Sequence, residues 1–573
     1  MFPPGKNRWG ETVVKMQESN MAVAKNTARS DTASQLSIFG FSELNCHTSL
    51  AVIDKLSATF FNEINWQYNP LDRDTFDEQR KDWDALSFSQ LNDGPQTITA
   101  DIRFFPALLF QLLALSLLYR LPDYDKSLEC LKYKAGMLLD DVANDYSDTG
   151  ADLGSLLGKE DISKVSIQAK FLRTLFLKTK GMVVESWDSL GHAIKDARVL
   201  GWHLDNSCQP SSISRNTVRD FWHTEVCRRT WLNLCLWDAH MSTMLGRPMR
   251  ICLTDLQTIP PIDLPAACNR AQIPDFSRSA SDIPTPLTVQ LFNRNITMFL
   301  VRADMLQKEN TKCRDFNKIR EVHDQIIEFR EHLPSYLWME NLNKSFDRHK
   351  DCLWLPEARG SVETMVWFAV LALHRSYLFT ISKSRVQALN AGLNILRVQG
   401  KAFLDLRTQQ YQNFLHFFST FDAAVTVAAI YTLYPTESPR HFEEAVQNVR
   451  LVITEFENTV NLNPLGRAAI SVLQALFDRL QKVAMTPKTS PSSTSLPISI
   501  RELDQMLNPG HALDADSCFV GHLDTVNPPL DVCVPSTQQP EQLHDSSNVQ
   551  EFQGEFDKDT FWNAMNQMEI EWR

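Results

Sequence analysis

The sequence predicts an all-α protein, and three observations support this prediction. Apolar residues recur at steps of three and four almost throughout residues 41–485, as one face of an amphipathic helix requires. No convincing run alternates apolar and polar residues as a half-buried strand does. Glycine is scarce, at 19 of 573 residues, which argues against many tight β-turns. We therefore expect one large multi-helix domain between residues 41 and 485.

Five stripes of apolar residues mark individual helices within this domain. Gly181 separates the first two stripes, Pro334 follows the third, and Asn463-Pro464 separates the last two. Glycine and proline in such places end helices. The stripes are Ile167, Phe171 and Leu175; Trp187, Leu190, Ile194, Ala197 and Gly201; Ile319, Val322, Ile326, Phe329 and Leu333; Val449, Val452, Phe456 and Val460; and Ile470, Leu473, Phe477 and Leu480.

The most apolar run of the chain covers residues 104–119. It is 16 residues long and contains Pro106, Gln111 and Ser116. A helix that crosses a membrane needs about 20 apolar residues. We therefore expect a buried core helix here and no membrane partner.

Charge is distributed unevenly along the chain. The formal net charge is −12, so no global basic field indicates nucleic-acid binding. From Thr486 onward the chain has 14 acidic and 4 basic residues, whereas the preceding residues are almost neutral. We expect a disordered segment at 1–40, a Ser/Thr/Pro-rich flexible linker at 486–550 and a separate acidic segment at 551–573.

The last 23 residues combine six acids with five large aromatic side chains. The acids keep such a segment solvated and leave the aromatic rings available to partners, which is typical of an activation segment. A C-terminal helix that docks on the body through the same rings is the alternative. The aromatic residues are Phe552, Phe556, Phe561, Trp562 and Trp572.

Sequence motifs for common catalytic sites are missing from the sequence. It contains no G-x-x-x-x-G-K-[ST], no H-E-x-x-H and no C-x-x-C. Asp140, Asp141 and Asp145 form a D-D-x-x-x-D run that resembles the magnesium-diphosphate motif of terpene synthases, but no second ligand set follows downstream. We interpret the run as a polar helix end and predict no catalytic, cofactor-binding or metal-binding residue. A helical magnesium-dependent diphosphate enzyme remains a distant alternative.

Several ordered blocks of sequence resemble one known family. Residues 187–205 read W-D-S-L-G-H-A-I-K-D-A-R-V-L-G-W-H-L-D, and residues 225–248 read E-V-C-R-R-T-W-L-N-L-C-L-W-D-A-H-M-S-T-M-L-G-R-P. Both resemble signature blocks of fungal-specific transcription factors, and D-L-Q-T-I-P-P-I-D-L-P at 255–265 is the expected continuation. Residues 103–122 and 371–379 add matches, so the resemblance spans roughly residues 41–480.

We interpret the signature residues as structural before assigning them any functional role. Cys227, Trp231 and Ser242 share one helical face, which makes Trp231 a core anchor. Asp238 needs a partner, and an arginine is the expected one. Arginines lie nearby, and Gly246 before Pro248 is a helix stop. A ligand pocket lined by Trp202, His203 and Arg247 is the alternative. The signature set is Gly201, His203, Arg228, Arg229, Trp231, Asp238, Ser242, Gly246, Arg247 and Pro248.

The resemblance implies a nuclear transcription regulator that is not an enzyme. It would control RNA polymerase II transcription of a metabolic or secondary-metabolite pathway, as a homo- or heterodimer. Its partners would be promoter DNA, reached directly or through a zinc-cluster partner, and the transcription machinery, recruited by the acidic tail.

The sequence departs from the family at its N-terminus. Family members bind zinc through an N-terminal cluster of six cysteines, whereas the first two cysteines here are Cys46 and Cys130. We therefore expect no cofactor in this chain. Two explanations stay open: a gene model that has lost an exon, or a protein without its own DNA reader. In the second case the protein would be a coregulator that acts through a zinc-cluster partner.

Overall fold

The computed structural model describes one part of the chain in detail. The chain divides into two units, and every described residue belongs to the first, Met1–Pro487. The predicted N-terminal segment, linker and activation segment lie outside the described residues. The described ranges are 50–87, 90, 97–119, 126–132, 136–157, 162–204, 218–265, 268–274, 278–279, 282–309, 315–405, 414–459 and 466–485.

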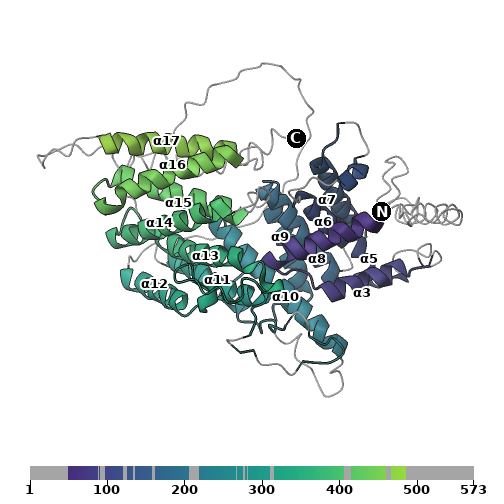
Figure 1. The fold of residues 1–573 in the computed structure, drawn as a ribbon. Helices are drawn as coiled ribbons and strands as arrows, with labels where there is room; N and C mark the ends of the chain where they lie inside the picture. Colours follow the sequence, from purple (N-terminus) through teal and green to yellow (C-terminus); the bar gives the residue numbers. More distant parts are fainter. Residues whose placement is uncertain are drawn as a thin grey trace, which may run out of the picture. The chain divides into compact units, whose positions relative to one another are not determined.

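Every regular element in these ranges is a helix, which confirms the predicted all-α class (Figure 1). Short 3₁₀ or π turns, labelled η, join some of the α-helices. The elements are α2 (Leu50–Thr59), η1 (Phe60–Ile64), η2 (Asn65–Gln67), α3 (Arg73–Asp84), α5 (Ala100–Arg103), α6 (Phe105–Leu118), η4 (Lys126–Leu131), α7 (Leu139–Leu156), α8 (Lys164–Thr179), α9 (Val183–Val199), α10 (Val218–Leu245), η6 (Leu253–Leu256), α11 (Pro286–Glu309), α12 (Phe316–Glu331), η7 (Ser335–Leu337), η8 (Lys350–Cys352), α13 (Leu355–Arg375), α14 (Ser382–Asp405), α15 (Phe414–Leu433), η10 (Pro439–His441), α16 (Phe442–Thr459) and α17 (Gly466–Met485).

Helix α6 is the core helix that the apolar run predicts. All of its residues are buried, and α2, α7 and α8 pack around it. Its polar residue Gln111 exchanges hydrogen bonds with Ser147 of α7, because Ser147 Oγ donates to Gln111 Oε1 at 2.7 Å and Gln111 Nε2 donates to the Ser147 carbonyl at 2.6 Å. Gly150 lets the two helices approach this closely, since a Cβ there would lie 2.7 Å from Gln111 Nε2. None of the helices in the described ranges is long and apolar enough to span a membrane.

The predicted apolar stripes are the buried faces of α8, α9, α12, α16 and α17. In α8, for example, Ile167, Phe171 and Leu175 are all buried, and Gly181 follows the helix as expected. Phe329 and Ile470 are half-buried members of their stripes. Val460 and the Asn463-Pro464 break lie outside the described residues.

The last four helices stack in succession above α13 in the view of Figure 1. Helix α14 packs on α13 and α15, and α17 packs on both α15 and α16. Their contacts are mainly apolar: Phe417 and Phe456 stack with ring centroids 4.7 Å apart, and Leu473 is fully buried. We call α14–α17 the C-terminal helices.

Candidate functional site: helix α10 and the adjoining cleft

Helix α10 carries half of the predicted signature residues and is buried on nearly all sides between Glu225 and Met244. The chain that follows it runs back beside it in a mainly irregular conformation. We call this stretch, residues 248–265 and 268–270, the return segment. Because little of it is helical, its buried backbone groups need partners from elsewhere.

The C-terminal half of α10 holds the beginning of the return segment. The Asp238 carboxylate accepts the backbone N–H groups of Arg250 at 2.6 Å and Ile251 at 2.9 Å. One turn later, Ser242 Oγ lies 3.5 Å from the carbonyl oxygen of Pro248, to which it donates. Asp238 is fully buried. Burial raises the pKa of Asp238 above its ordinary value, although the two N–H groups and the Arg250 guanidinium oppose this shift.

The N-terminal half of α10 holds the rest of the return segment. Trp231 Nε1 donates to the carbonyl oxygen of Asp255 at 3.1 Å, and Glu225 Oε2 accepts the N–H of Ile262 at 2.6 Å. Trp222 Nε1 donates to the carbonyl oxygen of Arg270 at 3.0 Å. Trp231 is 2% exposed, as expected of a core anchor. Side chains of α10, among them the signature residues Trp231, Asp238 and Ser242, therefore hold the return segment along almost the full length of the helix.

The arginine that pairs with Asp238 is Arg250, which the sequence analysis did not name. Arg250 Nη1 lies 3.5 Å from Asp238 Oδ1. The three candidate arginines have other partners: Arg228 pairs with Glu225 at 2.7 Å, Arg229 lies 3.8 Å from Asp72, and Arg247 stacks on Trp187. Helical spacing could not reveal this, because Arg250 lies beyond the helix and reaches Asp238 only after the chain turns back.

Two signature glycines end helices, α9 at Gly201 and α10 at Gly246. Both have positive φ angles, 75° and 62°, which glycine adopts without steric cost. In each case the next residue closes the end: the N–H of Trp202 donates to the carbonyl of Ala197, and that of Arg247 to the carbonyl of Ser242. This is the Schellman arrangement of a helix C-terminus.

Trp202, His203 and Arg247, suggested as a ligand pocket, do not line either of the two cavities described for this part of the fold. Trp202 is buried, and the His203 ring packs 6.3 Å from the Trp231 ring. Neither the large cleft described next nor the smaller cavity beside α9 is lined by any of the three residues.

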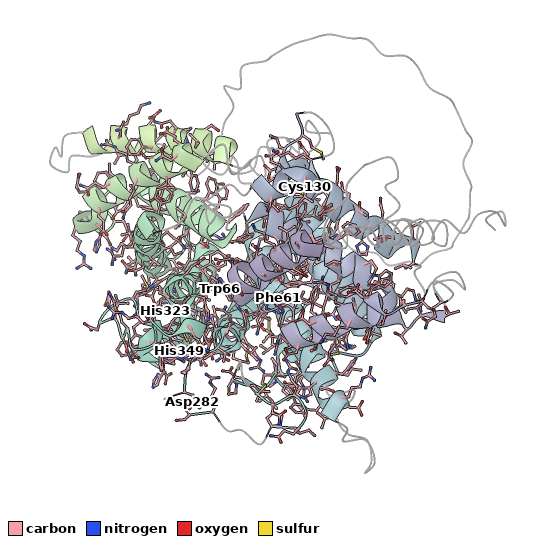
Figure 2. The ribbon with its side chains drawn as sticks, turned by 45° about the vertical axis from the view of Figure 1, so that its right-hand side comes forward. Phe61, Trp66, Cys130, Asp282, His323 and His349 are labelled. Atoms are coloured by element: carbon pink, nitrogen blue, oxygen red, sulfur yellow. The ribbon has the colours of Figure 1, made fainter. Side chains whose placement is uncertain are left out.

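A cleft of about 1170 Å³ opens next to α10. Its walls come from segments far apart in the sequence: residues 61–74, α10 and the return segment, the start of α11, residues 350–361 and the end of α14. Phe61 and Trp66, both of which line the cleft, lie near the centre of the view in Figure 2. The cleft is thus formed by the tertiary fold rather than by one local motif.

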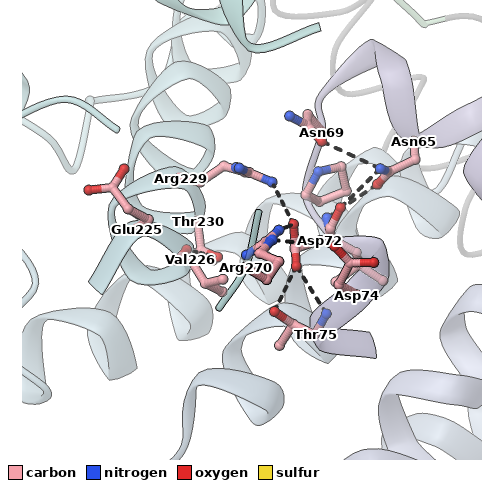
Figure 3. Close-up of polar contacts among 12 residues, drawn as sticks. Asn65, Asn69, Asp72, Asp74, Thr75, Glu225, Val226, Arg229, Thr230 and Arg270 are labelled. Carbon is pink, nitrogen blue, oxygen red and sulfur yellow. Dashed lines mark hydrogen bonds and ion pairs between the residues drawn. The ribbon is translucent and has the colours of Figure 1, made fainter. Parts of the chain in front are cut away.

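Asp72 is the centre of an ion-pair cluster in one wall of the cleft (Figure 3). It accepts the Thr75 N–H at 3.0 Å as the N-cap of α3, binds the guanidinium of Arg270, and lies 3.8 Å from Arg229. Burial alone would raise the pKa of Asp72, but the two guanidinium groups and the Thr75 hydrogen bonds outweigh it, so the pKa lies below its usual value. Burial lowers the pKa of Arg229.

Two tryptophans form an aromatic surface in the cleft. Trp66 and Trp354 stack with ring centroids 6.0 Å apart and planes 19° apart. Trp66 Nε1 donates to the Glu63 carbonyl and Trp354 Nε1 to the Asp351 carbonyl, at 3.1 and 2.8 Å. The N–H groups are thus satisfied locally, and the rings offer apolar faces.

Sequence reasoning singled out Arg229 but missed the residues around it. Asp72 and Arg270 are 198 positions apart, and no local pattern relates them. An N-cap signature at Asp72 was the only available signal, and it indicates a helix start rather than a site.

The run of Asp140, Asp141 and Asp145 lies in the first turns of α7, not at the end of a helix before a loop as the sequence suggested, because α7 continues to Leu156. Asp141 accepts the backbone N–H of Leu138 at 2.8 Å, which is a capping contact. Across the described ranges, no three His, Cys, Asp or Glu side chains are grouped so that they could hold a metal ion.

Comparison with known proteins shows that the chain is similar to a fungal transcription factor. The relative is "Transcription factor xilB" of Penicillium rubens, which is 24% identical over 207 residues. These residues are 36% of this chain and 29% of the relative, so the match spans less than a third of the relative's length. No family profile matches the chain.

Proposed function

We propose that this chain is a nuclear transcription regulator of the fungal-specific transcription factor family, which controls RNA polymerase II transcription of a metabolic or secondary-metabolite pathway. The similarity to xilB is the observation that carries the proposal. The role of the signature residues supports it, because Trp231, Asp238 and Ser242 act together to hold one segment.

In this proposal the helical body is the regulatory part and residues 551–573 recruit the transcription machinery. The protein reaches promoter DNA directly or through a zinc-cluster partner. A coregulator that acts through a zinc-cluster partner is the alternative. Cys46 is the only cysteine among the first 129 residues of the given sequence, and a gene model that has lost an exon would account for this equally well.

Chromatin occupancy of the tagged 573-residue chain in its native cell tests the proposal. We expect sharp peaks at promoters. Peaks that disappear when a zinc-cluster partner is deleted would identify the coregulator form. A nuclear protein without promoter peaks, or a protein outside the nucleus, would contradict the proposal.

A tethering experiment tests the activation segment separately. The full chain is fused to a bacterial DNA-binding domain that recruits it to a reporter gene. Replacing Phe561 and Trp562 with alanine should lower reporter transcription, because the acids remain and only the aromatic contacts are lost. Replacing Ser546 and Ser547 with alanine, just before the segment, is the matched control. Equal transcription from all fusions would remove the segment from the proposal.

A further inference from the structure

We propose that the cleft beside α10 binds a small aromatic carboxylate, with its ring system on Trp66 and Trp354 and its carboxylate on Arg229. Neither the similarity to xilB nor the proposed function assigns a ligand to this site, and the inference depends on neither. It follows from the size of the cleft and from the side chains that line it.

One wall of the cleft contains a guanidinium that can take an anion. Arg229 lines the cleft, its side chain is 16% exposed, and its ion pair with Asp72 is long, at 3.8 Å, whereas Arg270 binds Asp72 more closely. A partly exposed guanidinium with one long ion pair can take a further acceptor supplied from outside. A ligand carboxylate is such an acceptor, because arginine binds carboxylates strongly.

Three carboxylates act on Arg229, but each of them has another arginine as a partner. Asp72, whose side chain is 10% exposed, is bound by Arg270. Glu225 pairs with Arg228 and Asp263 with Arg278. Asp74 also contacts Arg270, but it is 60% exposed and therefore screened by solvent. The other half-buried acid of the cleft, Glu357, lies on α13 near Tyr68 and Tyr119, whose pKa values are raised by burial and further by this carboxylate.

The tryptophan pair in the lining of the cleft suits a flat apolar group. The Trp66 and Trp354 rings present apolar faces because both N–H groups are already bonded to backbone carbonyls. Leu353, next to Trp354, lines the cleft and is 71% exposed, which is high for a leucine side chain. Aromatic rings pack on such surfaces in offset stacks.

The cleft is large enough for a molecule of two or three rings. Its volume of about 1170 Å³ is slightly above the range of about 300 to 1000 Å³ typical of small-molecule sites.

Calorimetric titration of the purified full chain with 2-naphthoate tests the proposal. We expect saturable binding with a Kd of about 1 mM or tighter, a modest value for a ligand of this size. The uncharged analogue 2-naphthalenemethanol should bind about tenfold more weakly or worse, because it lacks the charge-assisted bond to Arg229. No saturable binding of 2-naphthoate up to about 5 mM, or equal binding of the two compounds, would overturn the proposal.

Two matched glycine substitutions show whether binding occurs in the cleft. Gly360 lines the cleft on α13, and a Cβ there would meet no atom within 4 Å, so Gly360→Trp can fill the space without displacing its neighbours. Gly154 on α7 is equally open but does not line the cleft, which makes Gly154→Trp the control. We expect the first variant to lose 2-naphthoate binding and the second to keep it. Retained binding in Gly360→Trp overturns the proposal.

Arg229→Gln tests the contact with the ligand carboxylate separately from the contact with the tryptophan rings. We expect the variant to bind 2-naphthoate at least about tenfold more weakly and to bind the alcohol as the natural chain does. An equal loss for both compounds would contradict the assigned role of Arg229. Should this variant not fold, the Gly360→Trp and Gly154→Trp pair still decides whether the cleft is the site.

Discussion

The return segment and the C-terminal helices are both packed into the protein, but different interactions hold them. On α10, the buried carboxylates Glu225 and Asp238 each accept a backbone N–H of the return segment, and within the segment itself the buried Asp255 accepts the N–H of Cys252. In the C-terminal helices, Glu455 is the only charged side chain that is buried among those described. Leucine, alanine, valine and phenylalanine make up most of the remaining buried side chains there.

The difference follows from how each region satisfies its backbone. A helix pairs its own N–H and C=O groups, so apolar side chains are enough to pack it. A buried irregular segment has unpaired N–H groups, and each of them needs an acceptor. Buried acids on α10 are therefore expected wherever the return segment lies against it, and their loss should affect the protein differently from a loss of apolar volume.

Asp238→Ala should cause the largest loss of stability. The substitution leaves the N–H groups of Arg250 and Ile251 and the Arg250 guanidinium without their carboxylate. Removing one partner of a buried charged pair costs about 3 to 5 kcal/mol. Urea unfolding measures the change. Asp152→Ala, at an exposed acid of α7, is the control and should change stability by less than about 0.5 kcal/mol. Similar losses of stability in Asp238→Ala and Asp152→Ala would contradict the view that buried carboxylates hold the return segment.

Leu473→Ala should cost somewhat less, about 3 kcal/mol, because it leaves a cavity between α15, α16 and α17. Leu473→Met keeps most of the volume and should cost under about 1.5 kcal/mol. The same unfolding measurement applies to both. If the methionine variant were as unstable as the alanine variant, volume would not be what holds the C-terminal helices.

Glu455→Gln tests the one buried acid of the C-terminal helices. Burial raises the pKa of Glu455 to about 8, whereas an unfolded glutamate titrates near about 4.3. The folded state therefore retains a proton that the unfolded state releases, so stability is highest below about pH 4.3 and falls as the pH rises to about 8. The slope is at most about 1.4 kcal/mol per pH unit.

Melting temperatures between pH 5 and 8 should show this decline in the natural chain and a smaller one in Glu455→Gln. Glu457→Gln, at an exposed position on the same helix, is the control and should keep the full decline. If Glu455→Gln kept the full decline in melting temperature too, the Glu455 carboxyl would not be its cause.

Periodicity in the sequence was sufficient for the helices but not for the site. The stripe of Ile167, Phe171 and Leu175 defined a buried face because helix contacts repeat with the helix itself. The partner of Asp238 is different, since Arg250 reaches it only through the path of the return segment. Asp72 and Arg270 meet across 198 positions, and such contacts depend on the whole tertiary arrangement.

Arg397→Ala should have the smallest effect, although its ion pair has good geometry. Arg397 Nη2 donates to Glu444 Oε2 at 2.8 Å, and a second bond runs from Arg397 Nε to the same carboxylate. Both side chains are about one-third or more exposed, so water competes for the same groups and salt screens the charges. We expect a loss under about 1 kcal/mol that shrinks further in 1 M sodium chloride. A loss comparable with that of Asp238→Ala would mean that polar contacts stabilise the C-terminal helices as strongly as they hold the return segment. The burial of an ion pair would then not explain why the two regions differ in what stabilises them.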